Sequence, residues 1–167
     1  IGLNNDGNVV CMKVNSNRYV RNLIFYINLN KNLIIDDIKE FPCTYKNLNA
    51  IKERLHPDKL FHYAIIASSV KLANYALERE AFITRDTFVN SAIHSAAILE
   101  IHLKITEEYV EEAMKAAFVN KNYDSIKLLV KKINNISQYI DMCNEEQKYQ
   151  VIKKIFIKEL ISRNQKR

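Results

Sequence analysis

Apolar residues recur every three or four positions along much of this chain, which is the spacing of one buried face of an α-helix. Short polar breaks such as Ser68-Ser69 and Asn120-Lys121-Asn122 interrupt the pattern. Between residues 57 and 135 the pattern therefore predicts three successive helix pairs. Their expected helices span residues 59–67 and 70–79, 88–95 and 97–104, and 109–119 and 123–133.

Polar residues in front of these apolar runs indicate where the helices begin. Asp58 can accept a hydrogen bond from a free backbone N–H, so it is expected to start the first helix of the first pair. Arg85-Asp86-Thr87 and Thr106-Glu107-Glu108 should open the second and third pairs. Carboxylates favour this position because the first turn of a helix carries a partial positive charge, so they are interpreted as solvated helix starts.

The first 56 residues form a less regular block, which is predicted to be helical with short strands. Residues 9–14 could form a strand, and residues 18–29 fit either type, with a helix preferred. Another short helix is expected at residues 33–40, ending before Pro42, because proline cannot continue a helix. A further helix is expected at residues 45–55. A small strand pair in this block is compatible with the pattern.

The last segment, residues 136–167, is predicted to contain a capping helix and a basic tail. Asn144 with Gln147 three residues later resembles a capping box, in which two side chains satisfy backbone N–H groups at a helix start. The apolar face that follows would cover the exposed side of the third pair. That face consists of Tyr149, Ile152, Ile155, Phe156 and Leu160.

Glycine usage favours helices over sheets. The chain has only two glycines, Gly2 and Gly7. Sheets and phosphate-binding loops normally need glycine for turns and for close backbone approach. With 167 residues, of which 48% are hydrophobic, the chain is long enough to bury a substantial core. We therefore expect an all-α fold in which helix pairs stack into a short solenoid.

The first helix pair resembles a divergent ankyrin repeat, whose pattern is Thr-Pro-Leu-His-x-Ala-Ala, two residues, Gly-His, one residue and Glu-Ile-Val-x-Leu-Leu-Leu. The match covers residues 59–77, and residues 114–130 are similar to the same pattern. In the first match, the places of leucine, histidine and the two alanines are taken by Phe61, His62, Ala64 and Ile65. The resemblance implies an ankyrin-like solenoid in which His62 bonds the backbone of a turn.

The chain departs from the ankyrin pattern in its spacing. Ala92 lies 28 residues after Ala64, and Ala117 lies 25 residues after Ala92, whereas ankyrin repeats are about 33 residues long. Lys59-Leu60 stands in place of Thr-Pro. The missing residues would come from the β-hairpin fingers with which the family commonly contacts partners. A helical-repeat fold of another lineage is therefore an alternative.

Stacked helix pairs usually bind other macromolecules, so the first hypothesis is a non-catalytic protein–protein interaction module. The first helices of the pairs and the loops between pairs would form its concave, partner-binding face. The candidate contacts on that face are His62, Asn90, His94 and Lys115.

The formal net charge of +6 supports an alternative, a basic nucleic-acid-binding protein or a structural protein of a virion or other assembly. The positive charge is concentrated near the C-terminus, where basic side chains of one helix could hold phosphates. The candidate residues are Lys153, Lys154, Lys158 and Arg163. The competing interpretation of these residues is a solubilising outer face of a capping helix.

No enzyme activity, cofactor or metal site is expected. The histidines have no metal-binding spacing to one another, to a cysteine or to a carboxylate. Cys11, Cys43 and Cys143 are widely spaced, as is typical of reduced thiols in an intracellular, cytoplasmic protein. No apolar run approaches the roughly 20 residues of a membrane span.

The frequent Asn, Ile and Lys residues are typical of AT-rich coding sequences. Such sequences occur in low-GC microbes, protozoa and large DNA viruses. For a viral protein the expected location would be the host cytoplasm or the virion.

Overall fold

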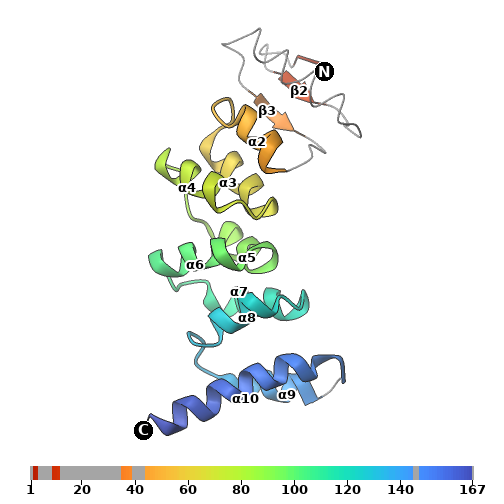
Figure 1. The fold of residues 1–167 in the computed structure, drawn as a ribbon, viewed down its shortest axis with the longest axis vertical. Helices are drawn as coiled ribbons and strands as arrows, with labels where there is room; N and C mark the ends of the chain where they lie inside the picture. The colour runs from red at the N-terminus through yellow and green to blue at the C-terminus, as the bar shows by residue number, and fades with distance from the viewer. Residues whose placement is uncertain (1, 4–8, 12–34, 39–43, 145–146, 167) are drawn as a thin grey trace. The chain divides into compact units, whose positions relative to one another are not determined.

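The computed structural model of the 167-residue chain describes residues 2–3, 9–11, 35–38, 44–144 and 147–166 (Figure 1). Helices dominate the described residues, which confirms the all-α class. The chain divides into two compact units, Ile1–Phe82 and Ile83–Arg167. Whether the helix pairs form one continuous solenoid stays a prediction.

The first unit begins with three short strands, β1 (Gly2–Leu3), β2 (Val9–Cys11) and β3 (Ile35–Ile38). β2 lies between the other two, antiparallel to β1 and parallel to β3. The strand predicted at residues 9–14 is therefore present at its beginning. The helix predicted at residues 18–29 lies outside the described residues.

The helix predicted at residues 33–40 is wrong, because Ile35–Ile38 forms a strand. Ile35 pairs with Val9 and Ile38 pairs with Cys11. A run of eight residues with several isoleucines fits either structure by periodicity, and β-branched side chains favour the extended one. Pairing with a strand distant in sequence decided the outcome.

Three helices complete the first unit: α2 (Tyr45–Ile51), α3 (Pro57–Ile66) and α4 (Val70–Glu78). α3 and α4 form a tight hairpin, and α2 packs against both of them. Their facing sides bury a continuous set of apolar residues. That core includes Leu48, Ile51, Leu55, Leu60, Phe61, Ala64, Ile65, Leu72, Ala73 and Ala76.

The start of α3 differs from the prediction. His56, and not Asp58, is the N-cap, and its Nδ1 accepts a hydrogen bond from the Asp58 N–H at 3.3 Å. Pro57 occupies the first helical position, where its fixed φ suits the helix and its missing N–H costs nothing. Asp58 serves another contact, because its Oδ1 accepts a hydrogen bond from the Phe82 N–H at 2.8 Å. Asp58 therefore ties the segment after α4 to the start of α3.

The second unit consists of three further helix pairs (Figure 1). The pairs are α5 (Arg85–His94) with α6 (Ala96–Ile105), α7 (Val110–Val119) with α8 (Tyr123–Leu129), and α9 (Ile136–Asn144) with α10 (Gln150–Gln165). α5 packs against α7, and α6 packs against α8, so the first two of these pairs lie on each other in the same orientation.

The turns of the α3/α4 and α7/α8 hairpins have the same geometry. Ser68 and Lys121 adopt left-handed backbone conformations with φ of 51° and 53°. The next N–H in each turn donates back to the preceding helix, Ser69 to the Ala64 carbonyl at 2.9 Å and Asn122 to the Ala117 carbonyl at 3.0 Å. These bonds satisfy carbonyls at the end of the first helix. The α5/α6 connection is shorter, because Ser95 alone joins the two helices.

One polar side chain starts the second helix of each of these hairpins. Ser69, Ser95 and Asn122 accept hydrogen bonds from the backbone N–H three residues later, at 3.3, 3.4 and 3.2 Å. The buried residues of all three second helices then fall three, four and seven positions after the cap. They are Leu72, Ala73 and Ala76; Ile98, Leu99 and His102; and Ser125, Ile126 and Leu129.

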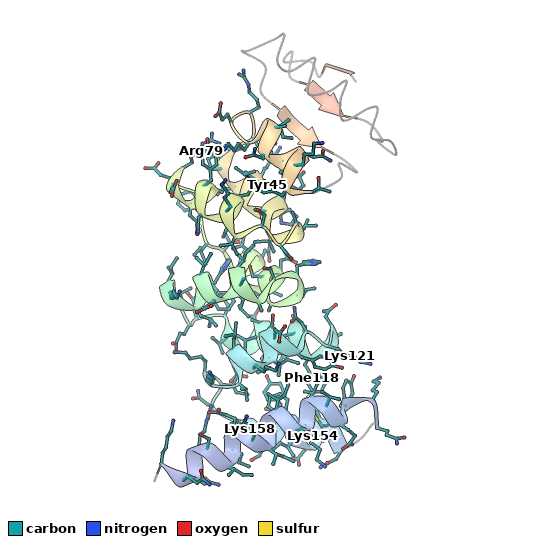
Figure 2. The ribbon with its side chains drawn as sticks, viewed as in Figure 1. Tyr45, Arg79, Phe118, Lys121, Lys154 and Lys158 are labelled. Atoms are coloured by element: carbon teal, nitrogen blue, oxygen red, sulfur yellow. The ribbon has the colours of Figure 1, made fainter. Side chains whose placement is uncertain are left out.

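The last hairpin is attached to the α7/α8 pair by aromatic side chains. Phe118 of α7 lies 4.6 Å from the Tyr149 ring, and Tyr139 of α9 stacks on Phe156 of α10 at 5.3 Å, measured between ring centroids. Figure 2 shows Phe118 directed toward α10. The apolar face predicted for the last helix is confirmed, since Ile152 and Phe156 are buried and its other members are partly buried in the same cluster.

The capping box predicted for the last helix is wrong. Asn144 ends α9, and a 3-10 turn, Gln147–Tyr149, precedes α10. Tyr149 is the N-cap and makes no side-chain cap hydrogen bond. Its ring packs against Phe118, so aromatic packing fixes the start of α10 where a polar cap was expected.

Replacing the cap of α8 should destabilise the second unit. Asn122 accepts the Ser125 N–H, and its Nδ2 donates to the Ile93 carbonyl at 3.0 Å, so Asn122→Ala removes two bonds. We expect a loss of about 2 kcal/mol in urea unfolding. Asn122→Ser should lose about half as much, because serine retains the cap. The exposed Asn74→Ala is the control, within about 0.5 kcal/mol of wild type. Equal stability of all variants would contradict this account.

Candidate interaction surface

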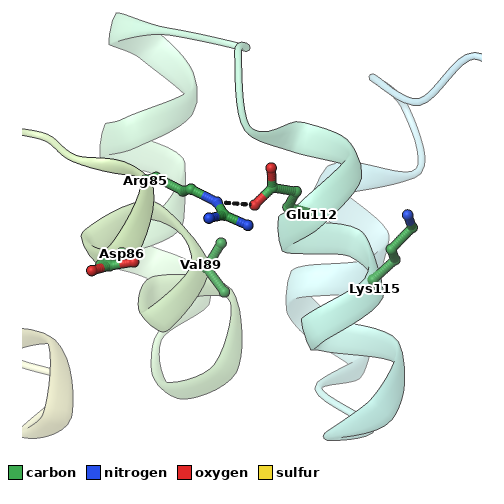
Figure 3. A pocket seen from close by; sticks show the side chains of 5 residues that line it. All are labelled: Arg85, Asp86, Val89, Glu112 and Lys115. Carbon is green, nitrogen blue, oxygen red and sulfur yellow. Dashed lines mark hydrogen bonds and ion pairs between the residues drawn. The ribbon is translucent and has the colours of Figure 1, made fainter.

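A groove of about 590 Å³ lies between α5 and α7. It is lined by Arg85, Asp86, Val89, Glu112 and Lys115 (Figure 3). These residues come from the first helices of two successive pairs. α5 and α7 pack through their buried faces, and the groove lies between the solvent-facing sides of the two helices.

An ion pair crosses the groove. The Arg85 Nε donates a hydrogen bond to the Glu112 Oε2, and this bond raises the pKa of Arg85. Both side chains are largely exposed, so the pair is screened by solvent. Among the described residues, Asp86 and Lys115 form no ion pair, which leaves one charge of each sign available along the groove. Of the described residues that line the groove, Val89 alone is apolar.

The structure brings some of the predicted contact residues together. Lys115 lines the groove. Asn90, half-buried, and His94, exposed, lie on the same helix as Val89, one and five positions after it. His62 belongs to the first unit, where it is exposed at α3 and its ring lies edge-on to Tyr63 at 5.7 Å. Within the described part of the chain, the His62 ring forms no hydrogen bond to a turn, unlike the role implied by the ankyrin pattern.

Arg85, Val89 and Glu112 were not anticipated as groove residues. Arg85 was assigned to a helix start and Glu112 to a solvated first turn. Their spacing carries a signal, because Arg85 and Val89 are one turn apart on α5, as are Glu112 and Lys115 on α7. That signal becomes informative only when α5 and α7 are known to be neighbours.

The basic residues proposed for nucleic acid separate into two groups. Lys154 and Lys158 are exposed on α10 and lie one turn apart (Figure 2). Arg163 is half-buried and engaged, since its Nη2 donates to the Val130 carbonyl at 2.7 Å and its Nε bonds Glu159 at 3.1 Å. Arg163 therefore fastens α10 to the end of α8. Lys153 is half-buried near Cys143.

A serine and a histidine lie close together in the core of the second unit. The His102 Nδ1 is 3.0 Å from the Ile98 carbonyl and 3.4 Å from the Ser91 Oγ. Because a carbonyl only accepts, Nδ1 carries the proton, and the Ser91 hydroxyl donates to the Thr87 carbonyl at 2.8 Å. Ser91 and His102 are fully buried, so no substrate can reach them. This polar group joins α5 to α6 and is structural.

The other reactive groups of the described residues are dispersed. No three histidine, cysteine, aspartate or glutamate side chains converge there as a metal site would require. Cys143 is a buried free thiol, and burial raises its pKa, partly offset by Lys153. No helix in the described ranges has the length and apolar character needed to cross a membrane.

The chain matches none of the protein-family models, curated proteins or solved structures with which it was compared. The ankyrin resemblance therefore stays a prediction.

His102 should make the stability of the second unit depend on pH. Burial lowers the pKa of His102 below its ordinary value of 6.5. The unfolded chain therefore binds a proton more readily than the folded one, and the free energy of unfolding decreases as the pH falls from 7 to 5. In α8 the position equivalent to His102 of α6, seven residues after the cap, is Leu129, and His102→Leu introduces the same residue into α6. We expect it to flatten the pH dependence of urea unfolding, and parallel pH profiles of the two proteins would contradict the assignment.

Proposed function

We propose that this chain is a non-catalytic protein-binding module of ankyrin-like helix pairs, with the α5/α7 groove as its contact surface. Lys115, Asn90 and His94 would contribute contacts, together with the groove residues Arg85 and Val89. The intracellular location expected from the cysteines is part of this proposal.

The supporting observation is the stacking of the α5/α6 and α7/α8 pairs. First helix packs on first helix and second on second, which is how repeat proteins present a row of equivalent side chains to a partner. The matching turns of α3/α4 and α7/α8 support a common hairpin plan. The groove between the first helices is the concavity this stacking creates.

The lining favours a polypeptide over a small molecule. Small-molecule sites are usually mostly apolar with a few fixed polar groups. This groove has one apolar side chain among charges of both signs. A protein segment can match these charges of both signs with its own charged side chains and amides. The Glu112 carboxylate is already bound by Arg85, so it offers no support for a catalytic role.

A nucleic-acid-binding or assembly protein is the second candidate. The exposed pair Lys154 and Lys158 on α10 favours it, since two phosphates could be held one helical turn apart. The exposed apolar Ile157 and Ile161 between and beyond these lysines argue against a purely phosphate-binding face. Lys154→Glu combined with Lys158→Glu, which leaves the buried Ile152 and Phe156 in place, should abolish any salt-sensitive gel shift if this candidate is correct.

Charge and shape changes in the groove should abolish partner capture. We expect Val89→Arg and Lys115→Glu each to reduce recovery of a co-purifying protein from source cells at least tenfold, about 1.4 kcal/mol. Lys115 is exposed and Val89 is half-buried outside the buried core, so thermal unfolding of both variants should stay close to that of the wild type. The control is Lys104→Glu on α6, an exposed lysine outside the groove. Undiminished capture by both groove variants, with the same protein identified by mass spectrometry, would exclude this surface.

A further inference from the structure

A second groove, between α8 and α10, is lined by more basic than acidic side chains. It has a volume of about 330 Å³, and its lining includes Lys127, Lys131 and Lys158. Its one carboxylate, Glu159, is held by Arg163 at 3.1 Å. Lys127 forms an exposed pair with Asp124, whereas Lys131 and Lys158 form no ion pair or hydrogen bond among the described residues. Two free ammonium groups therefore border the groove.

The floor of this groove is apolar. Leu128 of α8 and Ile155 of α10 line it, and both are only half-buried, although they pack against the core of the second unit. Along α10 the positions Val151, Ile155 and Lys158 follow helical spacing and form one stripe. Val151 is 54% exposed. Val151 thus extends the apolar face of Ile155 toward the start of α10, beyond the residues that line the groove.

The outer face of α10, outside the groove lining, also exposes apolar side chains. Ile157 and Ile161, one turn apart, are 37% and 51% exposed. A terminal helix that serves only to close a stack is expected to be polar on its outer side. α10 instead combines exposed apolar residues with Lys154 and Lys158, as in a helix that contacts a partner.

We propose that the α8/α10 groove binds an acidic amphipathic helix of another protein. The apolar face of such a helix would cover Leu128, Ile155 and Val151, and its flanking carboxylates would face Lys131 and Lys158. This is the helix-in-groove mode of recognition, in which apolar anchors give affinity and complementary charges give orientation and specificity. The site is separate from the α5/α7 groove and doesn't depend on it.

The chemistry of the groove disfavours other occupants. Single-stranded nucleic acid is held by cations together with aromatic side chains on which bases stack. Among the residues that the structure describes, no aromatic side chain lines this groove. A second copy of the chain would bring lysines against lysines in a two-fold contact.

A synthetic peptide provides the test. The probe is a fluorescein-labelled helix of about 16 residues with leucines at positions i, i+3, i+4 and i+7 and glutamates on both flanks. The matched control has the same composition in an order that breaks this spacing. By fluorescence anisotropy we expect the periodic peptide to bind at least tenfold more tightly than the scrambled one. Its affinity should also weaken as salt is raised.

Variants of the full chain locate the binding site. Lys131→Glu combined with Lys158→Glu should weaken peptide binding at least tenfold, and Val151→Ser should weaken it by a smaller factor. All three residues are exposed, so the fold should be retained, as circular dichroism would verify. Lys115→Glu in the α5/α7 groove should leave peptide affinity unchanged, so failure of either proposal can be told from failure of the other.

Three results would overturn the proposal. One is equal binding of the periodic and scrambled peptides, and another is unchanged binding by the double lysine variant. The third is tighter binding of a single-stranded oligonucleotide, or of vesicles containing anionic lipid, than of the periodic peptide.

Discussion

The arrangement of the helix pairs depends on where each second helix begins. Ser69, Ser95 and Asn122 each satisfy a backbone N–H three residues later, which fixes the first turn of α4, α6 and α8. Once that turn is fixed, the residues three, four and seven positions later share one face, because a helix has 3.6 residues per turn. In all three helices those positions are buried. A local hydrogen bond thus determines which side chains of each helix enter the core of its own unit.

The remaining contacts of the second unit are built around that core. The carboxylates at the start of α7 join it to its neighbours, since Glu112 bonds Arg85 of α5 and Glu111 accepts the Tyr139 hydroxyl of α9 at 3.0 Å. Burial, together with that bond, raises the pKa of Tyr139. Glu107 pairs with Lys132 after α8. Because the helices are joined through their inner faces and these edge contacts, the outward turns of α5 and α7 are left to border a groove.

Helix existence could be predicted from the sequence, because apolar periodicity and polar breaks are local signals. Helix starts were less predictable where another contact competed: Pro57 moved the start of α3 ahead of Asp58, and packing of Tyr149 replaced the expected cap of α10. The strand Ile35–Ile38 depends on a pairing partner far away in the chain. Lys115 was predicted as a surface contact, but Arg85 and Val89 were missed, because a groove is defined by which helices pack together. The bond from Arg163 to the Val130 carbonyl has no local signature.

In the proposed function, the α5/α7 groove faces another protein in the native setting. Site-specific photo-crosslinking tests this most directly, with a photoreactive residue placed at Val89 in the groove or at Glu100 on the exposed side of α6. We predict a discrete adduct with one partner protein from position 89 and none from position 100. No adduct at position 89, or the same adducts at both positions, would contradict the account.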